Sequence, residues 1–159
     1  MTHSELTDKQ SEHEIPEIFH RHIGVWQGTA IKVSPQGELQ RSFHGTFAVS
    51  ITGCDYHQEN TYTLADGNIR TLRFEGHFEN GVLILSSSDY PEFAATAWDA
   101  GNDTILFRSS KIENGKRYMY IETMTLTDPN SRVRSTQIFQ EGVFDGITYI
   151  EETRQEEVV

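Results

Sequence analysis

Residues 69–87 read IRTLRFEGHFENGVLILSS, and this stretch decides the fold. In its first half Leu72, Phe74 and Phe78 alternate with polar side chains, the period-two pattern of a strand with one face in the core. Asn80-Gly81 then favours a type I′ turn, because Asn and Gly tolerate the positive φ that both central residues of that turn require. A second apolar run follows at once. The stretch therefore predicts a β-hairpin.

The same pattern of β-rich runs and turn residues continues from Gly24 to the end of the chain. Dipeptides such as Asp66-Gly67, Asn114-Gly115 and Glu141-Gly142 separate the runs, and no gap can hold the crossover helix that parallel strands need. We therefore predict an all-β fold, an antiparallel up-and-down meander barrel of eight to ten strands, because closure removes the open sheet edges. The predicted strands are 25–33, 38–52, 56–65, 69–78, 82–87, 93–99, 104–111, 117–127, 132–140 and 143–154.

The chain has 159 residues, the size of one domain. Residues 1–13 are polar without apolar periodicity and are predicted to form a disordered tail, which leaves 14–159 as a single barrel domain. Within 14–23, Pro16 stands near a first helical position and Ile18 and Phe19 belong to an apolar stripe of roughly helical spacing. This segment predicts a short amphipathic helix that plugs one end of the barrel.

The charge of the chain argues against two classes of partner. It contains 24 Asp and Glu against 13 Lys and Arg, a formal net charge of -11, which repels phosphate backbones and anionic lipid. We therefore expect no nucleic-acid and no membrane partner. Cys54 is the single cysteine, so no internal disulfide is possible, and the first residues show neither a basic region nor an apolar run. The expected location is the cytoplasm.

A short signature at the two ends of the predicted barrel resembles a known superfamily. Gly24-Val25-Trp26-Gln27-Gly28 opens the first strand after a helical turn, and Arg154 lies near the end of the last strand. This combination resembles the calycin superfamily of lipocalins and fatty-acid-binding-like proteins. The resemblance implies that Trp26 packs at the closed end with Arg154 lying across it, and a cation–π contact suits that arrangement.

More narrowly, the chain is similar to an uncharacterised bacterial calycin family, common in cyanobacteria and related in fold to the phycobiliprotein chromophore lyases. The likeness is carried by the Gly24 segment, by Ser34-Pro35-Gln36-Gly37-Glu38-Leu39 and by the stretches 58–62 and 78–83. It implies a lipocalin-like fold and no particular activity, because a fold does not determine a function.

Period-two alternation also predicts polar side chains inside the barrel. A barrel of this strand number holds its own side chains and one small ligand, and pockets for small molecules have apolar walls with a few polar groups. The alternative is that these polar groups satisfy one another or bind buried waters. The predicted ligand-binding residues are Gln58, Asn60, Tyr62, Phe74, Trp98, Tyr120, Glu122 and Gln137.

The first functional hypothesis is a protein that binds a small apolar or amphipathic molecule inside the barrel, without a cofactor. The second is an enzyme, a bilin lyase or an isomerase-like catalyst, in which burial raises the pKa of Glu122 toward values useful for proton transfer. Pairing with Arg108, Arg134 or Arg154 would instead keep Glu122 charged and structural. The third is a barrel with a packed lumen that acts through homodimerisation.

Metal and haem sites are not expected. His20 and His22 form the closest histidine pair, but residues two apart on a helix do not face each other, and no cysteine or carboxylate cluster completes a ligand set. No histidine follows His77, so the late axial histidine of nitrobindin-like barrels has no counterpart. Glu151 and Glu152 are predicted to lie on a solvated face.

Overall fold

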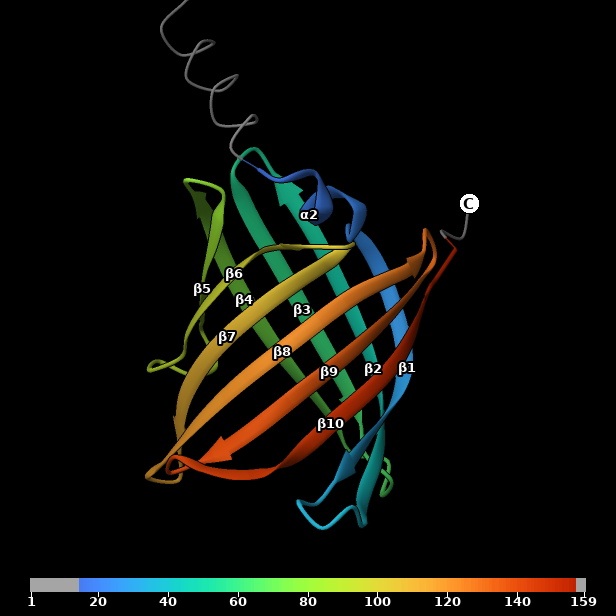
Figure 1. Ribbon diagram of the computed structural model, residues 1–159, viewed down its shortest axis with the longest axis vertical. Coiled ribbons are helices and arrows are strands. Elements are labelled where there is room, and N and C mark those ends of the chain that lie inside the picture. The colour runs from blue at the N-terminus through green and yellow to red at the C-terminus, as the bar shows by residue number, and fades with distance from the viewer. Residues whose placement is uncertain (1–14, 157–159) are drawn as a thin grey trace, which may run out of the picture.

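The computed structural model describes residues 15–156, which form one closed antiparallel barrel of ten strands preceded by a short helix (Figure 1). The predicted all-β, up-and-down barrel is confirmed. Each strand pairs with the next in the chain, and the last pairs with the first. The elements are α2 (Glu17–Arg21), β1 (Gly24–Val33), β2 (Leu39–Thr52), β3 (Asp55–Thr63), β4 (Ile69–Glu79), β5 (Val82–Ser87), β6 (Ala94–Gly101), β7 (Thr104–Glu113), β8 (Lys116–Asp128), β9 (Ser131–Gln140) and β10 (Val143–Arg154).

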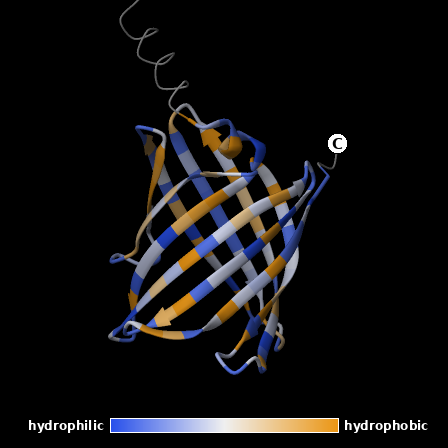
Figure 2. Ribbon diagram, in the orientation of Figure 1, coloured by the Kyte–Doolittle hydropathy of each residue, from blue (hydrophilic) through white to orange (hydrophobic). Residues whose placement is uncertain are grey.

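The hairpin turns follow the residues that predicted them. Asn80 and Gly81 have φ of 50° and 80°, and Asn114 and Gly115 have φ of 53° and 74°, as type I′ geometry requires. Every observed strand boundary lies within two residues of its prediction. Hydrophilic and hydrophobic residues alternate along many of the strands, as expected where one face of a strand points to the interior and the other to solvent (Figure 2). The predicted tail, residues 1–13, lies outside the described part of the chain.

The two ends of the barrel differ. The turns β2–β3, β4–β5, β6–β7 and β8–β9 lie at the end where α2 packs, and the remaining turns surround the opposite end (Figure 1). α2 is shorter than predicted and begins directly after Pro16. Its Phe19 is buried and meets the Phe78 ring edge-on at 5.0 Å between centroids, while Arg21 pairs with Asp103 at 2.7 Å. The helix therefore closes this end, as predicted. No helix in residues 15–156 is long and apolar enough to cross a membrane.

Trp26 occupies the centre of the closed end. The side chain is fully buried, and the guanidinium carbons of Arg132 and Arg154 each lie 4.3 Å from its ring centroid. The indole nitrogen donates a hydrogen bond to the carbonyl oxygen of His22 at 3.1 Å. The stacking of Arg154 on Trp26 is the contact that the calycin resemblance implies, and Arg132 adds a second cation.

Arg154 also joins three segments at this end. Its guanidinium donates to the carbonyl oxygens of Arg21, the last residue of α2, and of Ile23, just before β1. It also donates to the carbonyl oxygen of Pro129 in the β8–β9 turn. Gly24 makes room for it: φ is 130°, and a Cβ there would lie 2.7 Å from Arg154 Nη1. The Gly-x-Trp signature therefore reflects packing, because a side chain at Gly24 would displace the arginine from the tryptophan.

A buried ion network lies beneath Trp26 and corrects one prediction. Glu152, predicted to be solvated, is 1% exposed and accepts hydrogen bonds from Arg132 at 2.7 Å and Arg134 at 2.8 Å. The sequence pattern misled because charged residues at a chain end are usually solvated, whereas β10 continues to Arg154 and turns Glu152 inward. Burial opposes ionisation of Glu152, but the charges of Arg134 and Arg132 outweigh it and lower its pKa.

His22 completes this network as a neutral group. Its Nδ1 lies 3.0 Å from Arg132 Nη1, and because a guanidinium can only donate, Nδ1 must accept. Nε2 then carries the hydrogen and is buried without a partner among the described residues. Burial, followed by the charges of Arg132 and Arg134, lowers the pKa of His22 from 6.5 to about 3.

Arg154→Ala is expected to destabilise the barrel by about 2 kcal/mol, because charge-assisted hydrogen bonds to three carbonyls and the stacking on Trp26 are lost together. Urea unfolding followed by circular dichroism measures this change. Arg108→Ala, which removes an exposed arginine from the outer wall, is the matched control and should leave stability nearly unchanged. Equal stability of the two variants would contradict the role assigned to Arg154.

His22→Gln is expected to flatten the dependence of stability on pH. In the unfolded chain His22 binds a proton below about 6.5, while in the folded protein it stays neutral down to about 3. The wild type should therefore lose stability as the pH falls through this window, by at most about 1.4 kcal/mol per pH unit. Urea titrations from about pH 7 to pH 4.5 should show a shallower slope for His22→Gln. His44→Gln, on the outer face, is the control and should keep the wild-type dependence of stability on pH. If His22→Gln also keeps the wild-type slope, His22 does not cause the loss of stability at low pH.

Candidate functional site

The lumen of the barrel holds a cavity of about 660 Å³ that opens at the end opposite α2. Its inner part is bounded by buried apolar side chains, including Phe47, Phe107 and Ile150. Farther out, Leu72 and Phe74 of β4 belong to the wall, as their alternation predicted. The lumen is therefore not filled by its own side chains, and its size lies within the range of pockets that take small molecules.

A strip of polar side chains runs along the inward face of β3. The Tyr56 hydroxyl donates to Gln58 Oε1 at 2.6 Å, Gln58 Nε2 donates to Asn60 Oδ1 at 2.8 Å, and Asn60 Nδ2 donates to the Tyr62 hydroxyl at 3.1 Å. The predicted alternative, that these groups satisfy one another, is thus largely met. The chain of bonds runs in one direction, so the Tyr62 hydroxyl hydrogen has no acceptor among the described residues.

Tyr62 can offer that hydrogen to a ligand because it stays a neutral phenol. Burial raises its pKa above the ordinary 10.0, so the hydroxyl keeps its proton at neutral pH. The ring lines the cavity and packs edge-on against Phe43 and Phe47, at 5.4 and 5.9 Å between centroids. Tyr62 therefore presents one fixed hydrogen-bond donor in an otherwise aromatic part of the wall.

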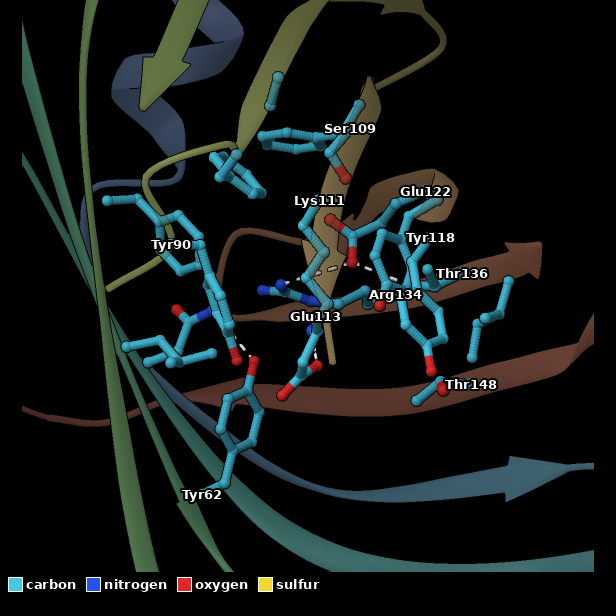
Figure 3. A pocket seen from close by; sticks show the side chains of 18 of the residues that line it. Tyr62, Tyr90, Ser109, Lys111, Glu113, Tyr118, Glu122, Arg134, Thr136 and Thr148 are labelled. Carbon is cyan, nitrogen blue, oxygen red and sulfur yellow. Dashed lines mark hydrogen bonds and ion pairs between the residues drawn. The ribbon is translucent and has the colours of Figure 1, made fainter. Parts of the chain in front are cut away.

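Glu122 is paired inside the cavity (Figure 3). Its Oε1 accepts a hydrogen bond from the Thr136 hydroxyl at 2.9 Å and lies 3.6 Å from Arg134 Nη1. Of the three arginines considered from the sequence, Arg134 is the partner. Burial opposes the charge of Arg134, but the carboxylates of Glu152 and Glu122 outweigh it and raise the pKa of this guanidinium. Glu122 is thus the luminal member of the buried ion network.

Charged and aromatic groups mix at the mouth of the cavity (Figure 3). The Lys111 ammonium lies 4.5 Å from the Tyr90 ring centroid and 5.7 Å from those of Tyr118 and Tyr120. It also pairs with Glu113 at 2.9 Å, and this hydrogen bond is the main reason that the pKa of Glu113 is lowered. Lys111 therefore already fills the space between these tyrosines as a cation.

Six of the eight predicted ligand-binding residues line the cavity. They are Gln58, Asn60, Tyr62, Phe74, Tyr120 and Glu122.

The prediction that Trp98 and Gln137 face the lumen is wrong. On β6 the inward positions are the buried Ala95 and Ala97, so Trp98 lies on the outer wall opposite Leu106 of β7. On β9 the cavity is lined by Arg134, Thr136, Ile138 and Gln140, and Gln137 is exposed between them. In both strands the position of a residue in the alternation, and not its residue type, decides whether its side chain faces the lumen, because neighbouring side chains point to opposite faces.

Several cavity residues were missed from the sequence. Lys32, Arg41 and Lys111 are cations that line the mouth, and Tyr90 reaches it from the β5–β6 loop. Strict alternation from Trp26 already places Lys32 on the inward face, because the two are six residues apart. Charged residues at strand ends are usually assigned to solvent, which hid this signal. Tyr90 lies in a loop, where side chains do not alternate between two faces, so no sequence pattern could place it at the cavity.

No group of three His, Cys, Asp or Glu side chains that could hold a metal ion occurs within residues 15–156. Cys54 is free.

Comparisons with solved structures agree on the fold. The S-type phycobiliprotein lyase CpeS from Guillardia theta superposes with a TM-score of 0.67 at 10% identity, covering 99% of this chain and 100% of that one. Rv2717c from M. tuberculosis superposes with a TM-score of 0.62 at 13% identity, covering 89% of this chain and 99% of that one. At these identities the likeness concerns the fold alone. No curated protein matches the sequence.

A further structural match comes from a protein of unknown function of the DUF3598 family from Nostoc punctiforme. It superposes with a TM-score of 0.62 at 12% identity over 86% of this chain and 49% of its own, so the present chain spans about half its length. A family model described as "Domain of unknown function (DUF3598), N-terminal" matches residues 11–157. These matches confirm the resemblance to an uncharacterised calycin-like family related in fold to the lyases, and the chain belongs to the DUF3598 family.

Proposed function

We propose that this protein binds a small apolar or amphipathic molecule inside the barrel. The observation that carries the proposal is the cavity of about 660 Å³, with aromatic and aliphatic walls and a Tyr62 hydroxyl hydrogen that has no acceptor among the described residues. An apolar molecule that enters this space leaves water and gains contact with the rings of Phe43, Phe74 and Phe93. The Tyr62 hydroxyl orients the molecule, because its hydrogen is available to an acceptor on the ligand.

The rim of the mouth supports the same function. The large apolar side chains that are exposed lie near the strand ends surrounding the open end, and none belongs to the turns at the α2 end. Such a rim reduces the cost of bringing an apolar molecule from water to the cavity. It is also the surface on which the homodimer alternative would rest. The exposed side chains are Leu39, Leu64, Ile69, Ile112, Val143, Phe144 and Ile147.

The lyase or isomerase alternative receives less support from the site. One protein of similar fold is a phycobiliprotein lyase, at 10% identity. Acid–base catalysis by Glu122 needs a carboxyl group that exchanges a proton with the bound molecule. Glu122 instead pairs with Arg134 at 3.6 Å and accepts a hydrogen bond from Thr136 at 2.9 Å, so its Oε1 is already engaged within the protein. We therefore retain binding without catalysis as the proposed function.

A neutral fluorescent probe tests the proposal. N-phenyl-1-naphthylamine brightens in apolar surroundings and should bind the wild type saturably at one site. Ser109 lines the cavity, so Ser109→Trp should fill part of it and weaken binding at least about tenfold. Fluorescence titration measures both affinities, and circular dichroism confirms that the variant is folded.

Ser110→Trp is the matched control, because Ser110 is the next residue of β7 and does not line the cavity. It should bind the probe as the wild type does. The proposal would be wrong if folded Ser109→Trp bound the probe unchanged, or if Ser110→Trp weakened binding as much.

A further inference from the structure

The cavity is basic although the protein is acidic. Five of the 13 Lys and Arg residues line it, against three of the 24 Asp and Glu residues, so its charge is opposite in sign to that of the molecule. Folding has therefore concentrated cations at this site. The basic residues are Lys32, Arg41, Arg70, Lys111 and Arg134, and the acidic residues are Glu113, Glu122 and Asp145.

Three of these cations have close carboxylate partners. Arg134 pairs with Glu152 at 2.8 Å in the buried network. Lys111 and Arg70 share Glu113, at 2.9 and 3.4 Å. These contacts leave little of their charge for a ligand.

Arg41 and Lys32 differ from the others. Arg41 forms no ion pair with any described carboxylate, and its guanidinium carbon lies 5.7 Å from the ring centroid of Phe43 on the cavity wall. Among the carboxylates of residues 15–156, Lys32 pairs only with Asp145, at 3.8 Å. Two carboxylates of the mouth loops are engaged with backbone amides instead: Asp66 accepts from the amide of Asn68, and Asp89 from that of Arg73.

Lys32 and Arg41 also stand directly opposite each other on β1 and β2. Both line the cavity, so both side chains lie on the same face of the sheet. Like charges directly opposite across an antiparallel pair are destabilising. An anion placed between them would remove this repulsion and accept hydrogen bonds from both, and a guanidinium binds a planar or tetrahedral oxyanion with two parallel bonds.

We propose that Lys32 and Arg41 bind the acidic head group of an amphipathic ligand whose apolar body lies in the lumen. The ligand class is an organic acid with a carboxylate, sulfonate or phosphate at one end. This inference rests on the proposed function, since it assigns the orientation of a molecule in that same cavity. A cationic head group fits the mouth less well, because Lys111 already lies between the tyrosines that would stack on it.

The test compares two probes that differ in one group. 8-Anilino-1-naphthalenesulfonate carries a sulfonate that N-phenyl-1-naphthylamine lacks, and the aromatic body is otherwise the same. Arg41→Gln is expected to lower the affinity for the sulfonate probe by about three- to tenfold, because charge-assisted hydrogen bonds are lost. The double variant that combines Lys32→Gln with Arg41→Gln should lose more affinity. The neutral probe should change less than about twofold in the same variants.

Arg73→Gln is the matched control, since it removes one positive charge from the outer face, where Arg73 pairs with Glu59 at 3.3 Å. This variant should bind both probes with the wild-type affinity. Raising NaCl from about 0.05 to 0.5 M should lower the affinity of the wild type for the sulfonate probe more than that of the double variant. The ligand-free Arg41→Gln protein should melt at or above the wild-type temperature, because the repulsion with Lys32 is relieved.

The outcomes separate this inference from the function beneath it. If the neutral probe binds in the lumen and the double variant holds the sulfonate probe as tightly as the wild type, the anion site is wrong and the proposed function stands. If neither probe binds the wild type, the proposed function fails and the anion site fails with it. A lower melting temperature of ligand-free Arg41→Gln would contradict the repulsion between the two cations.

Discussion

The stacking of Trp26 between two guanidinium groups is the contact on which the barrel depends. Trp26 lies on β1, Arg154 lies directly opposite on β10, and Arg132 comes from β9, so one indole joins the first strand to the last two. This is the seam at which an up-and-down sheet either closes or leaves two unpaired edges. Gly24 leaves the space for Arg154, and α2 is held by the same guanidinium. Closure and the plug therefore share one interaction.

The buried charges at the closed end decide what the lumen can offer a ligand. Arg132 and Arg134 face Glu152 and Glu122, and burial lowers the pKa of Arg132 only to about 10, so both arginines stay charged at neutral pH. Two cations and two anions balance, and the inner end of the cavity carries no net charge. Removing these four charged side chains from water is costly, but in the folded protein each of them has a partner of opposite charge. The uncompensated charge of the site is therefore at the mouth, where solvent is close and a head group can reach it.

The lumen has aromatic walls and a basic mouth, whereas the outer surface of the molecule is polar and acidic. The outer surface carries most of the 24 acidic residues, so its charge is opposite in sign to that of the mouth. Lys32 and Arg41 lie directly opposite each other, an arrangement of like charges that is expected to cost stability. The polar strip of β3 differs from this pair, because its hydrogen bonds are made before any ligand arrives.

The sequence by itself determined the strands, their order and the closed barrel, because turn dipeptides and period-two alternation are local signals that each hairpin carries within about twenty residues. It also determined the β3 strip, since Gln58, Asn60 and Tyr62 follow that alternation. Only the tertiary structure decided that Glu152 is buried between two arginines, that Trp98 lies outside, and that Arg41 lies opposite Lys32. These outcomes depend on register between strands and on the barrel ends, where residues far apart in the chain meet, and no local pattern encodes such distances.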